Sequence, residues 1–581
     1  MHTVKLYKCY KTMKANRVNI SGIKSHYQTS CSLEKYTVLV GQNNSGKSNL
    51  LFALRWLLGE IKLSVENINS ITESQNTSEI SMEVEFILDE NEVSPTCLQD
   101  IVEQGRFWLV GNVKTSDLKK KDLSPSYQVK NDHGTIKPLK ATELKSFIGQ
   151  IIYIPAIRSL SDEVKLTSSS SITKLISKYV VERVKNEDQK SNRYNKVVSA
   201  IQNLSEYIND GEDSAFNQLK SSLANYMLDY PDVEIGFELT PLDADELIKS
   251  CFTPYTKVFG SNKSLDLDSQ GMGFQRSLVF SLLCNIADLN HSDTSSKYTL
   301  YLIEEPEMFL HPNHQSHFRN KLKELSKSQN TQIVITSHSP YFLSNVDDYS
   351  EIKRLSFSNQ KSLLMEISRE KIIEICQLNG RKMAIAKNIV RTNPITRVDL
   401  HRQAREIAEA DELRYLLWID PNRANAFLSQ KVILVEGSTE KAVFSFLFNN
   451  INGCFYNDKR KTDVMVIDVT GKFHFYKFVR LLYQLGISVW VVYDGDNDKE
   501  DRNKISHKAL NKYIKRLKVK GEIVDCCRLD PDLELSFGLV KDHNTVDVSI
   551  YQHLQSNTVN CLSSNGYSTL TTFISGVLNH K

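Results

Sequence analysis

The sequence predicts an α/β protein of several domains. Apolar runs of strand length recur along the chain, and helix-period stretches such as residues 48–58 and 440–449 lie between several of them. Strands that alternate with helices in this way form parallel sheets with crossover helices. A length of 581 residues is too great for one core and indicates two to four domains.

The predicted strands are short apolar runs bounded by turn residues. Residues 159–232 differ, because they are polar and show helical spacing, so we expect a helical insertion there. Residues 369–428 carry strong helix formers with capping signals and predict a helical connector. The strands are expected at residues 37–40, 80–88, 150–154, 298–303, 332–336, 432–435, 463–469 and 488–493.

The composition is that of an ordinary soluble globular chain. It is 40% hydrophobic and 24% charged, and its 72 basic and 69 acidic residues leave a formal charge of +3. Any basic surface for nucleic acid must therefore be local. Ten cysteines without a CxxC pair argue against a zinc ribbon or a disulfide scaffold and favour a reducing compartment. No apolar run has the length of a membrane helix, so we expect a cytoplasmic protein with no membrane partner.

A phosphate-binding loop of the Walker A type spans residues 41–48. Its glycines let backbone N–H groups surround a phosphate, and the start of the following helix adds positive potential. Lys47 would contact the β and γ phosphates of ATP, and Ser48 would ligate magnesium. The expected strand before the loop and the helix after it disfavour a plain glycine-rich turn. The expected nucleotide-binding residues are Gly41, Asn43, Asn44, Ser45, Gly46, Lys47 and Ser48.

An apolar run at residues 298–303 ends in two carboxylates, Glu304 and Glu305. Glu304 would lie by the magnesium and, because it replaces the commoner Asp, would ligate it through water. Glu305 would act as the base that orients an attacking water. Alone, the run could be a buried strand with a charged end. Beside the phosphate-binding loop we interpret it as a Walker B motif.

These motifs resemble the ABC-type ATPase heads of recombination and chromosome-maintenance proteins. The resemblance makes residues 268–276 a divergent signature motif, with Ser269, Gly271 and Gly273 at the nucleotide, and makes His338 a catalytic switch histidine. In such heads the signature of one protomer closes over ATP bound by another, which implies a homodimer or higher homo-oligomer. Without the resemblance, the glycines are only a phosphate-friendly helix start, and His338 is equally well structural.

A second acidic constellation lies far downstream. One buried strand ends in Glu436, and Glu440 follows one turn into the next helix. Another buried strand ends in Asp494 and Asp496, with Asp498 two residues further on. If the two strands are neighbours in a parallel sheet, their carboxylates converge at its C-terminal edge, where ligands bind.

Such convergence needs a cation or protons. Two carboxylates about 4 Å apart repel by roughly 4 kcal/mol at an effective dielectric near 20. All-oxygen ligands favour Mg²⁺ or Mn²⁺ over zinc, and the chemistry best served is phosphodiester cleavage. For residues 494–498 taken alone, a solvated turn explains the acidic cluster equally well.

The pairing resembles the Toprim domain, and the order of motifs resembles the overcoming lysogenisation defect (OLD) family of ATP-dependent nucleases, including the Gabija nuclease subunit and retron-associated nucleases. The resemblance implies Glu436, Glu440, Asp494 and Asp496 as metal ligands, with Asp498 and Glu534 as additions. It also implies a late catalytic lysine, for which Lys541 is a weak candidate outside any matching motif. The implied partners are DNA and either a UvrD-like helicase or a retron reverse transcriptase with its DNA.

The expected domain order follows from these motifs. Residues 1–158 and 251–368 form an ABC ATPase in two parts, and residues 159–250 are a helical insertion and candidate dimerisation element. Residues 369–430 form the connector, and residues 431–581 the Toprim nuclease domain.

The leading function is an ATP-regulated, metal-dependent DNA endonuclease or nickase in anti-phage defence. The alternative is a non-nucleolytic ATP-driven DNA clamp or sensor. A basic stretch at residues 507–520 would grip DNA phosphates, although a solvated helix face explains it equally well.

Overall fold

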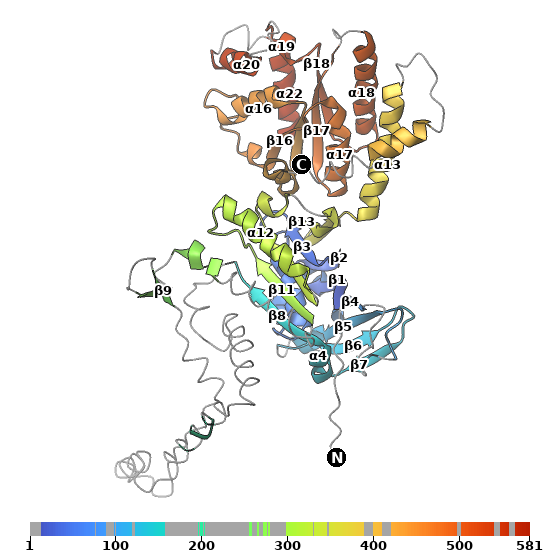
Figure 1. Cartoon of the computed structure of the whole chain (residues 1–581), viewed down its shortest axis with the longest axis vertical. Helices are drawn as coiled ribbons and strands as arrows, with labels where there is room; N and C mark the ends of the chain where they lie inside the picture. Colours follow the sequence, from blue (N-terminus) through green and yellow to red (C-terminus); the bar gives the residue numbers. More distant parts are fainter. Residues whose placement is uncertain are drawn as a thin grey trace. The chain divides into compact units, whose positions relative to one another are not determined.

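The structure is a computed structural model of the whole chain (Figure 1). It divides into two compact units, one of Met1–Ile151, Thr294–Glu307 and Pro312–Lys581, and one of Ile152–Asp293 and Met308–His311. Most of the expected helical insertion, and the predicted site residues Ser269, Asp498 and Lys541, lie outside the described residues. The described residues are 13–75, 77–88, 98, 100–118, 122–156, 196, 198–200, 203, 255–257, 264–266, 271–275, 277–278, 298–328, 330–344, 348–388, 399–408, 420–496, 501–539, 546–556 and 564–580.

The first sheet is antiparallel and has the strand order β2-β1-β4-β5-β6-β7. Only two residues join β1 to β2, and the first of them, Lys24, has a φ of +49°. So short a connection permits only antiparallel pairing, and the expectation of parallel sheets is therefore wrong for this sheet. Its strands are β1 (Met13–Ile23), β2 (His26–Ser32), β4 (Glu79–Leu88), β5 (Arg106–Lys114), β6 (Ser126–Lys130) and β7 (Ile136–Leu139).

The second sheet carries the phosphate-binding loop and has the order β14-β13-β3-β12-β11-β8. Strands β13, β3, β12 and β11 are parallel, and β14 is an antiparallel edge strand. Every residue of β3 is buried, as expected for a strand covered on both faces. The strands are β3 (Tyr36–Val40), β8 (Ile148–Ile154), β11 (Tyr298–Glu304), β12 (Thr331–Thr336), β13 (Ile352–Ser358) and β14 (Lys361–Glu366).

Two main helices accompany this sheet. Helix α1 (Lys47–Leu57) contacts β12 and also β1 and β4 of the antiparallel sheet, whereas α12 (Pro312–Ser326) contacts β12 and β3. The smaller elements are η1 (Val65–Asn67), α2 (Ser70–Ser74), α3 (Thr115–Leu118), α4 (Ala141–Phe147), β9 (Tyr255–Lys257), β10 (Ser264–Asp266), η4 (Pro340–Phe342) and η5 (Tyr349–Glu351).

The connector is helical over its described residues, as predicted. It consists of α13 (Arg369–Asn388), a helix at residues 399–408, α15 (Pro421–Ala424) and η6 (Asn425–Leu428). Helix α13 contacts α17 and α18 of the C-terminal domain.

The C-terminal domain is built on a four-stranded parallel sheet of order β16-β15-β17-β18. The strands that end at the two acidic motifs, β15 and β17, are hydrogen-bonded neighbours, which confirms the predicted adjacency. Its elements are β15 (Lys431–Val435), α16 (Ser438–Asn449), η7 (Lys459–Asp463), β16 (Val464–Asp468), η8 (Lys472–His474), α17 (Phe475–Gln484), β17 (Ser488–Asp494), α18 (Asp501–Val519), β18 (Asp525–Leu529), α19 (Leu533–Ser536), α20 (Val546–Gln555) and α22 (Asn565–Asn579).

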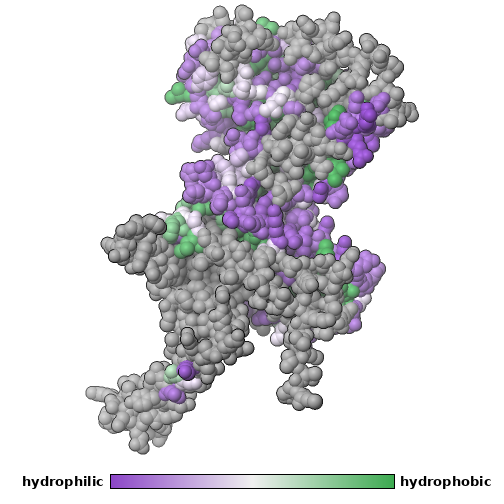
Figure 2. All heavy atoms as spheres, viewed as in Figure 1, coloured by the Kyte–Doolittle hydropathy of each residue, from purple (hydrophilic) through white to green (hydrophobic). Residues whose placement is uncertain are grey.

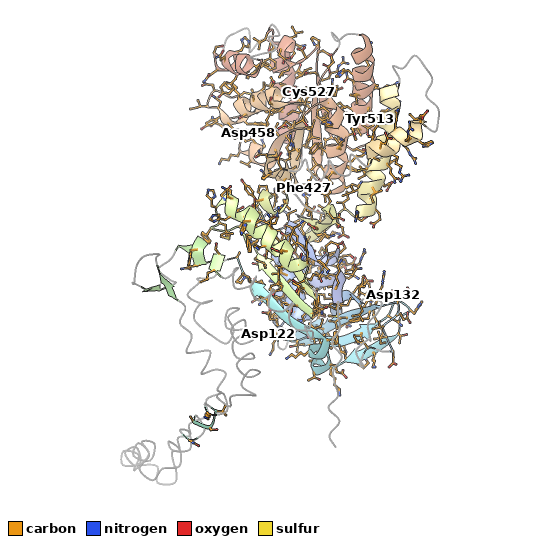
Figure 3. The ribbon with its side chains drawn as sticks, viewed as in Figure 1. Asp122, Asp132, Phe427, Asp458, Tyr513 and Cys527 are labelled. Atoms are coloured by element: carbon orange, nitrogen blue, oxygen red, sulfur yellow. The ribbon has the colours of Figure 1, made fainter. Side chains whose placement is uncertain are left out.

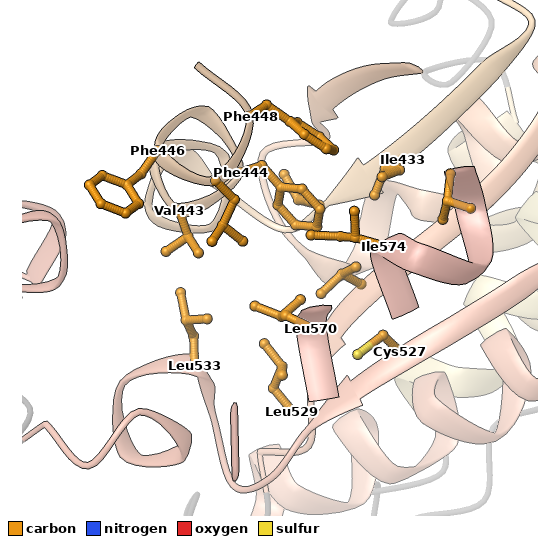
Figure 4. Packing of buried hydrophobic residues seen from close by; sticks show 14 of the residues in the cluster. Ile433, Val443, Phe444, Phe446, Phe448, Cys527, Leu529, Leu533, Leu570 and Ile574 are labelled. Carbon is orange, nitrogen blue, oxygen red and sulfur yellow. The ribbon is translucent and has the colours of Figure 1, made fainter. Parts of the chain in front are cut away.

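Helices cover both faces of this sheet (Figure 1). On one face, Ile433 packs with Phe444 of α16 and Ile574 of α22 (Figure 4), and Trp490 belongs to the same cluster. On the other, α17 and α18 meet through Tyr476 and Leu510. Burial on both faces accounts for the continuous apolar runs that predicted β15 and β17.

An arginine links the sheet of the phosphate-binding loop to the C-terminal sheet. Arg354 on β13 is 3% exposed and donates hydrogen bonds to the carbonyls of Ser429, Leu485 and Gly486 at 3.0 to 3.3 Å. Those carbonyls immediately precede β15 and β17. Burial lowers the pKa of Arg354 to about 10.

On the face that Figure 2 shows, the described residues are mainly hydrophilic. Figure 2 shows small, scattered hydrophobic patches on the face in view. Among the described helices, none is long and apolar enough to span a membrane.

The C-terminal core predicts a local stability difference. Phe444 is 1% exposed within this core, whereas Ile451, just beyond the end of α16, is 77% exposed. We expect Phe444→Ala to destabilise the domain by about 3–5 kcal/mol, because it removes a buried aromatic ring and leaves a cavity. Hydrogen exchange in β15 and α16 measures the effect. Ile451→Ala is the control, and equal exchange in the two variants would contradict this core assignment.

Candidate active sites

The phosphate-binding loop connects β3 directly to α1, as predicted. A Cβ at Gly41 would lie 2.1 Å from the Leu355 carbonyl oxygen, and one at Gly46 would lie 2.1 Å from Ser362 Oγ. Gly46 also has a φ of +102°. Both positions therefore require glycine, because the hairpin of β13 and β14 packs against the loop.

The loop holds its own lysine. Lys47 Nζ donates hydrogen bonds to the carbonyls of Gly41 at 2.9 Å and Gln42 at 2.8 Å. Burial lowers the pKa of Lys47 to about 8, although nearby glutamates oppose the shift. Of the other predicted loop residues, Ser45 is buried, and Asn43, Asn44 and Ser48 are exposed.

The second carboxylate motif lies two strands from the loop, since β12 separates β3 from β11. Glu304 ends β11, and Glu305, with a φ of +42°, donates its N–H to the Thr336 carbonyl at 2.9 Å. His338 Nε2 lies 3.8 Å from Glu305 Oε1, and the His338 N–H donates to Glu307. The structure thus brings Glu305 and the predicted switch histidine together.

Electrostatics connect this motif to the loop. Burial lowers the pKa of His338, and the charge of Lys47 lowers it further. Burial also raises the pKa of Glu307, a residue that sequence analysis did not select. Glu307 Oε2 is buried without a hydrogen-bond partner in the described part of the chain. An unsatisfied acceptor here fits a site that receives a hydrated cation with its nucleotide.

The signature glycines lie in the smaller unit. Gly271 precedes a short helical turn, and a Cβ at Gly273 would lie 2.6 Å from the Phe309 carbonyl. Tight packing therefore explains Gly273 without a nucleotide, and the role of both glycines stays a prediction.

The second acidic site forms where β15 and β17 end. Glu436 Oε1 accepts a hydrogen bond from the Asp494 N–H at 2.9 Å, so the two motifs meet. The Gly495 and Asp496 N–H groups donate to the carbonyls of Leu529 and Pro531, each at 2.6 Å. A Cβ at Gly495 would lie 1.9 Å from Asp530 Oδ1. The Asp-Gly-Asp turn therefore packs closely against the residues that follow β18.

Two further predicted carboxylates lie near this pair. Glu440 is buried and accepts the Gly437 N–H at 3.0 Å, which caps α16. Burial raises the pKa of Glu440 to about 7, and the charges of Glu436 and Glu534 contribute. The pKa of Asp494 is raised to about 9. Burial is the largest cause, and the negative charges of Glu436, Glu440, Asp496 and Glu534 raise the pKa further. We call these five residues the acidic centre: Glu436, Glu440, Asp494, Asp496 and Glu534.

A lysine that sequence analysis missed neutralises part of the acidic centre. The Lys472 side chain is 1% exposed. Its ammonium pairs with Asp496 Oδ2, lies 3.4 Å from Glu436 Oε1, and donates to the Asp494 carbonyl. The signal was its place directly after a strand and Gly471, because β16 neighbours β15 and ends at the same edge of the sheet.

The donors of the acidic centre suit a hard divalent cation, since all are carboxylate oxygens. Asp494 Oδ1 is buried without a hydrogen-bond partner in the described part of the chain. However, no group of three or more His, Cys, Asp or Glu side chains there is arranged to hold a metal ion. The Lys472 ammonium contacts two of the carboxylates instead, so metal binding requires these side chains to reorient.

The raised pKa of Asp494 predicts a pH dependence of stability. Folded protein without metal retains a proton on Asp494 that the unfolded chain releases above its pKa of about 3.9. Stability should therefore fall as pH rises from about 4 towards about 9, by up to about 1.4 kcal/mol per pH unit. Thermal unfolding in a chelator between about pH 5 and pH 8 measures this fall.

Asp494→Asn should reduce this pH dependence, whereas the control Asp525→Asn should retain it. Added Mg²⁺ should raise the Tm more at the higher pH, because it competes with the proton for the carboxylates. An identical pH dependence in Asp494→Asn and wild type would contradict the assignment.

Comparisons with known proteins agree with this organisation. The AAA ATPase domain family matches residues 13–137 and 111–343, and the overcoming lysogenization defect protein-like TOPRIM domain matches residues 427–496. The Old nuclease of Escherichia phage P2 is 26% identical over 84% of this chain and 78% of its own. Endonuclease GajA of Bacillus cereus (strain VD045) is 22% identical over 83% of this chain and 75% of its own.

Among solved structures, the SMC head domain from Thermotoga maritima covers 61% of this chain and 99% of its own, at 15% identity and a TM-score of 0.32. The family matches confirm the expected ATPase and Toprim domains. The chain therefore belongs to the AAA ATPase domain family and joins that ATPase to an OLD-like TOPRIM nuclease domain.

Proposed function

We propose that this chain is an ATP-regulated DNA endonuclease or nickase that depends on Mg²⁺ or Mn²⁺ and serves in anti-phage defence. The observation that carries the proposal is the acidic centre, in which buried carboxylates converge at the carboxyl ends of neighbouring parallel strands. The names Old nuclease and endonuclease GajA, given to relatives over most of the chain, support the nuclease part.

The residues of the acidic centre have distinct proposed roles. Glu436, Glu440, Asp494 and Asp496 would ligate the metal, with Glu534 and Asp498 as additional ligands by resemblance. A bound divalent cation supplies an activated water and charge stabilisation at the leaving oxygen of a phosphodiester. Lys472 would hold Asp496 and Glu436 in position against their mutual repulsion. This role makes Lys472 a stronger candidate than Lys541 for the lysine that the family implies.

The nucleotide site would regulate cleavage. Lys47 would contact the phosphates, and Ser48 and Glu304 would hold the nucleotide's magnesium. Glu305 would orient the attacking water, with His338, kept neutral by burial and by Lys47, 3.8 Å from its carboxylate. The motif of Ser269, Gly271 and Gly273 would complete the ATP site of a second protomer in a homodimer or larger assembly, with residues 159–250 as the dimerisation element.

Partners and location remain part of this proposal. Duplex DNA is the proposed substrate, the cytoplasm the proposed location, and a UvrD-like helicase or a retron reverse transcriptase with its DNA the proposed partner system. The domain boundaries at residues 158, 250, 368 and 430 are proposals in the same sense.

One observation favours the non-nucleolytic alternative of an ATP-driven DNA clamp or sensor. Lys472 already compensates two carboxylates, and no three-ligand arrangement exists among the described residues. A clamp would retain plasmid in a nucleotide-dependent way and leave every strand intact.

The acidic centre predicts metal-dependent nicking. Wild-type protein should nick supercoiled plasmid with Mg²⁺ or Mn²⁺, and Asp494→Ala should lower the rate by more than about 100-fold, because it removes a metal ligand. Gel separation of plasmid forms measures the rate. Asp525→Ala is the control, since Asp525 lies in the same domain but pairs with Lys518. Unchanged nicking by Asp494→Ala would refute the assignment.

The ATPase site predicts separable binding and hydrolysis. Glu305→Gln should retain nucleotide binding and lose about 10²–10⁴-fold in hydrolysis, because the water loses its base. Lys47→Ala should weaken binding itself. The exposed pair Glu324 and Lys321 supplies the control, Glu324→Gln. Hydrolysis by Glu305→Gln at the wild-type rate would mean that another residue orients the water.

Nicking with no nucleotide, ATP and a non-hydrolysable analogue then defines the regulation. If binding alone controls cleavage, ATP should act on Glu305→Gln as the analogue acts on wild type. Identical nicking under all three conditions would contradict ATP regulation.

A further inference from the structure

We propose that the exposed side of α18 binds the phosphate backbone of the duplex DNA that reaches the acidic centre. Four cations define this side, which we call the basic face: Lys508, Lys512, Lys515 and Arg516. The inference rests on the proposed DNA nuclease function and assigns the substrate a docking surface.

The four residues form one continuous surface. Spacings of four, three and one residues place them on the same side of a helix. All four are exposed, and none has an ion-pair partner in the described part of the chain. Lys518 provides a contrast on the same helix, since its ammonium lies 2.5 Å from Asp525 Oδ1. The basic face therefore has its charge available for a partner.

Other side chains of α18 are buried in the domain or contact the acidic centre. Leu510, Ile514 and Leu517 are buried, and Tyr513 on the same helix is labelled in Figure 3. Asn511 Nδ2 donates to the Gly495 carbonyl, and His507 Nδ1 lies 2.9 Å from Asp496 Oδ2.

The basic face consequently begins one residue after a side chain that contacts the acidic centre. At a rise of about 1.5 Å per residue, it extends about 12 Å from Lys508 to Arg516. Each strand of B-DNA carries one charge per about 3.4 Å of the axis, so a strand along the helix would present about three or four phosphates to this length.

The charge pattern is unusual for a merely solvated helix. Residues 507–520 contain six basic and no acidic side chains, although the whole chain carries only +3. Exposed helices commonly gain stability from oppositely charged pairs at i,i+4, whereas Lys508 with Lys512 and Lys512 with Arg516 repel each other. A polyanion bound across the basic face would relieve that repulsion. DNA fits better than an acidic protein, because the same helix contacts the proposed cleavage centre.

The test measures DNA binding by the full chain with fluorescence anisotropy on unrelated duplex sequences. In the variant K508Q/K512Q/K515Q/R516Q, the slope of log K against log salt should decrease by about 1 per lost phosphate contact, up to about 4 in total. Affinity should fall equally for all duplex sequences. Salt from about 50 to 200 mM gives the slope.

Matched variants complete the test. K518Q removes a charge of the same helix that Asp525 already neutralises, and it should leave the slope as in wild type. The charge-conserving variant K508R/K512R/K515R/R516K should also bind as wild type. An unchanged slope and affinity in the four-glutamine variant, or an equal loss in K518Q, would overturn the proposal.

A second readout separates this surface from the nuclease assignment. Metal-dependent hydrolysis of bis(p-nitrophenyl) phosphate, which is too small to span the basic face, should be the same in wild type and the four-glutamine variant. If wild type does not hydrolyse it or nick plasmid, the nuclease proposal fails, while the salt slopes still decide whether DNA binds α18. If the four-glutamine variant loses this hydrolysis while folded, the basic face acts on the centre and not on DNA, which overturns the inference.

Discussion

Repulsion among carboxylates at one edge of a parallel sheet is the constraint that organises the C-terminal domain. The adjacency of β15 and β17 forces Glu436 against Asp494, and the tight turn at Gly495 directs Asp496 back to the same place. At an effective dielectric near 20, each close pair costs roughly 4 kcal/mol if both groups are charged. A fold that tolerates this cost must supply positive charge, protons or a cation.

In this structure, positive charge and protons offset the repulsion among the carboxylates. Lys472 supplies one buried positive charge to a cluster of five carboxylates, which leaves most of the repulsion uncompensated. Burial and, after it, the charges of the neighbouring carboxylates raise the pKa of Asp494 to about 9, and a proton takes the place of a cation. A divalent cation would release that proton and add charge, so the same arrangement that strains the domain without metal favours metal binding.

The motifs that were predictable share a local physical signature. Two-sided burial makes β3, β11, β12, β15 and β17 continuous apolar runs, and the functional groups follow the ends of these strands. The antiparallel strands β5 to β7 escaped prediction because strand formation there depends on cross-strand partners that the sequence does not identify. Lys472 escaped because its place after a strand and Gly471 does not by itself show that it meets the acidic motifs. Only the three-dimensional order β16-β15-β17 brings it to the acidic motifs.

Residues beside the phosphate-binding loop and residues beside the acidic centre are far apart in the sequence but close in the structure. Arg354 belongs to the strand beside β3, and its guanidinium bonds the peptide groups that precede β15 and β17. Gln42 in the phosphate-binding loop also accepts a hydrogen bond from Gln430, at 2.7 Å. These contacts give the larger unit a short physical connection between the phosphate-binding loop and the strands of the acidic centre.

The small net charge of the chain hides a local repulsion between the acidic centre and the proposed DNA substrate. An acidic centre that repels its own carboxylates also repels a DNA phosphate, and a local surface of opposite sign has to offset this repulsion for a duplex to approach. A chain of +3 overall achieves that only by segregating charge. Helix α18 meets this need on its two sides. His507 and Asn511 contact the acidic loop, whereas the cations of the basic face are exposed. Electrostatic attraction to α18 and charge compensation by metal would then act on the same phosphate backbone from adjacent positions.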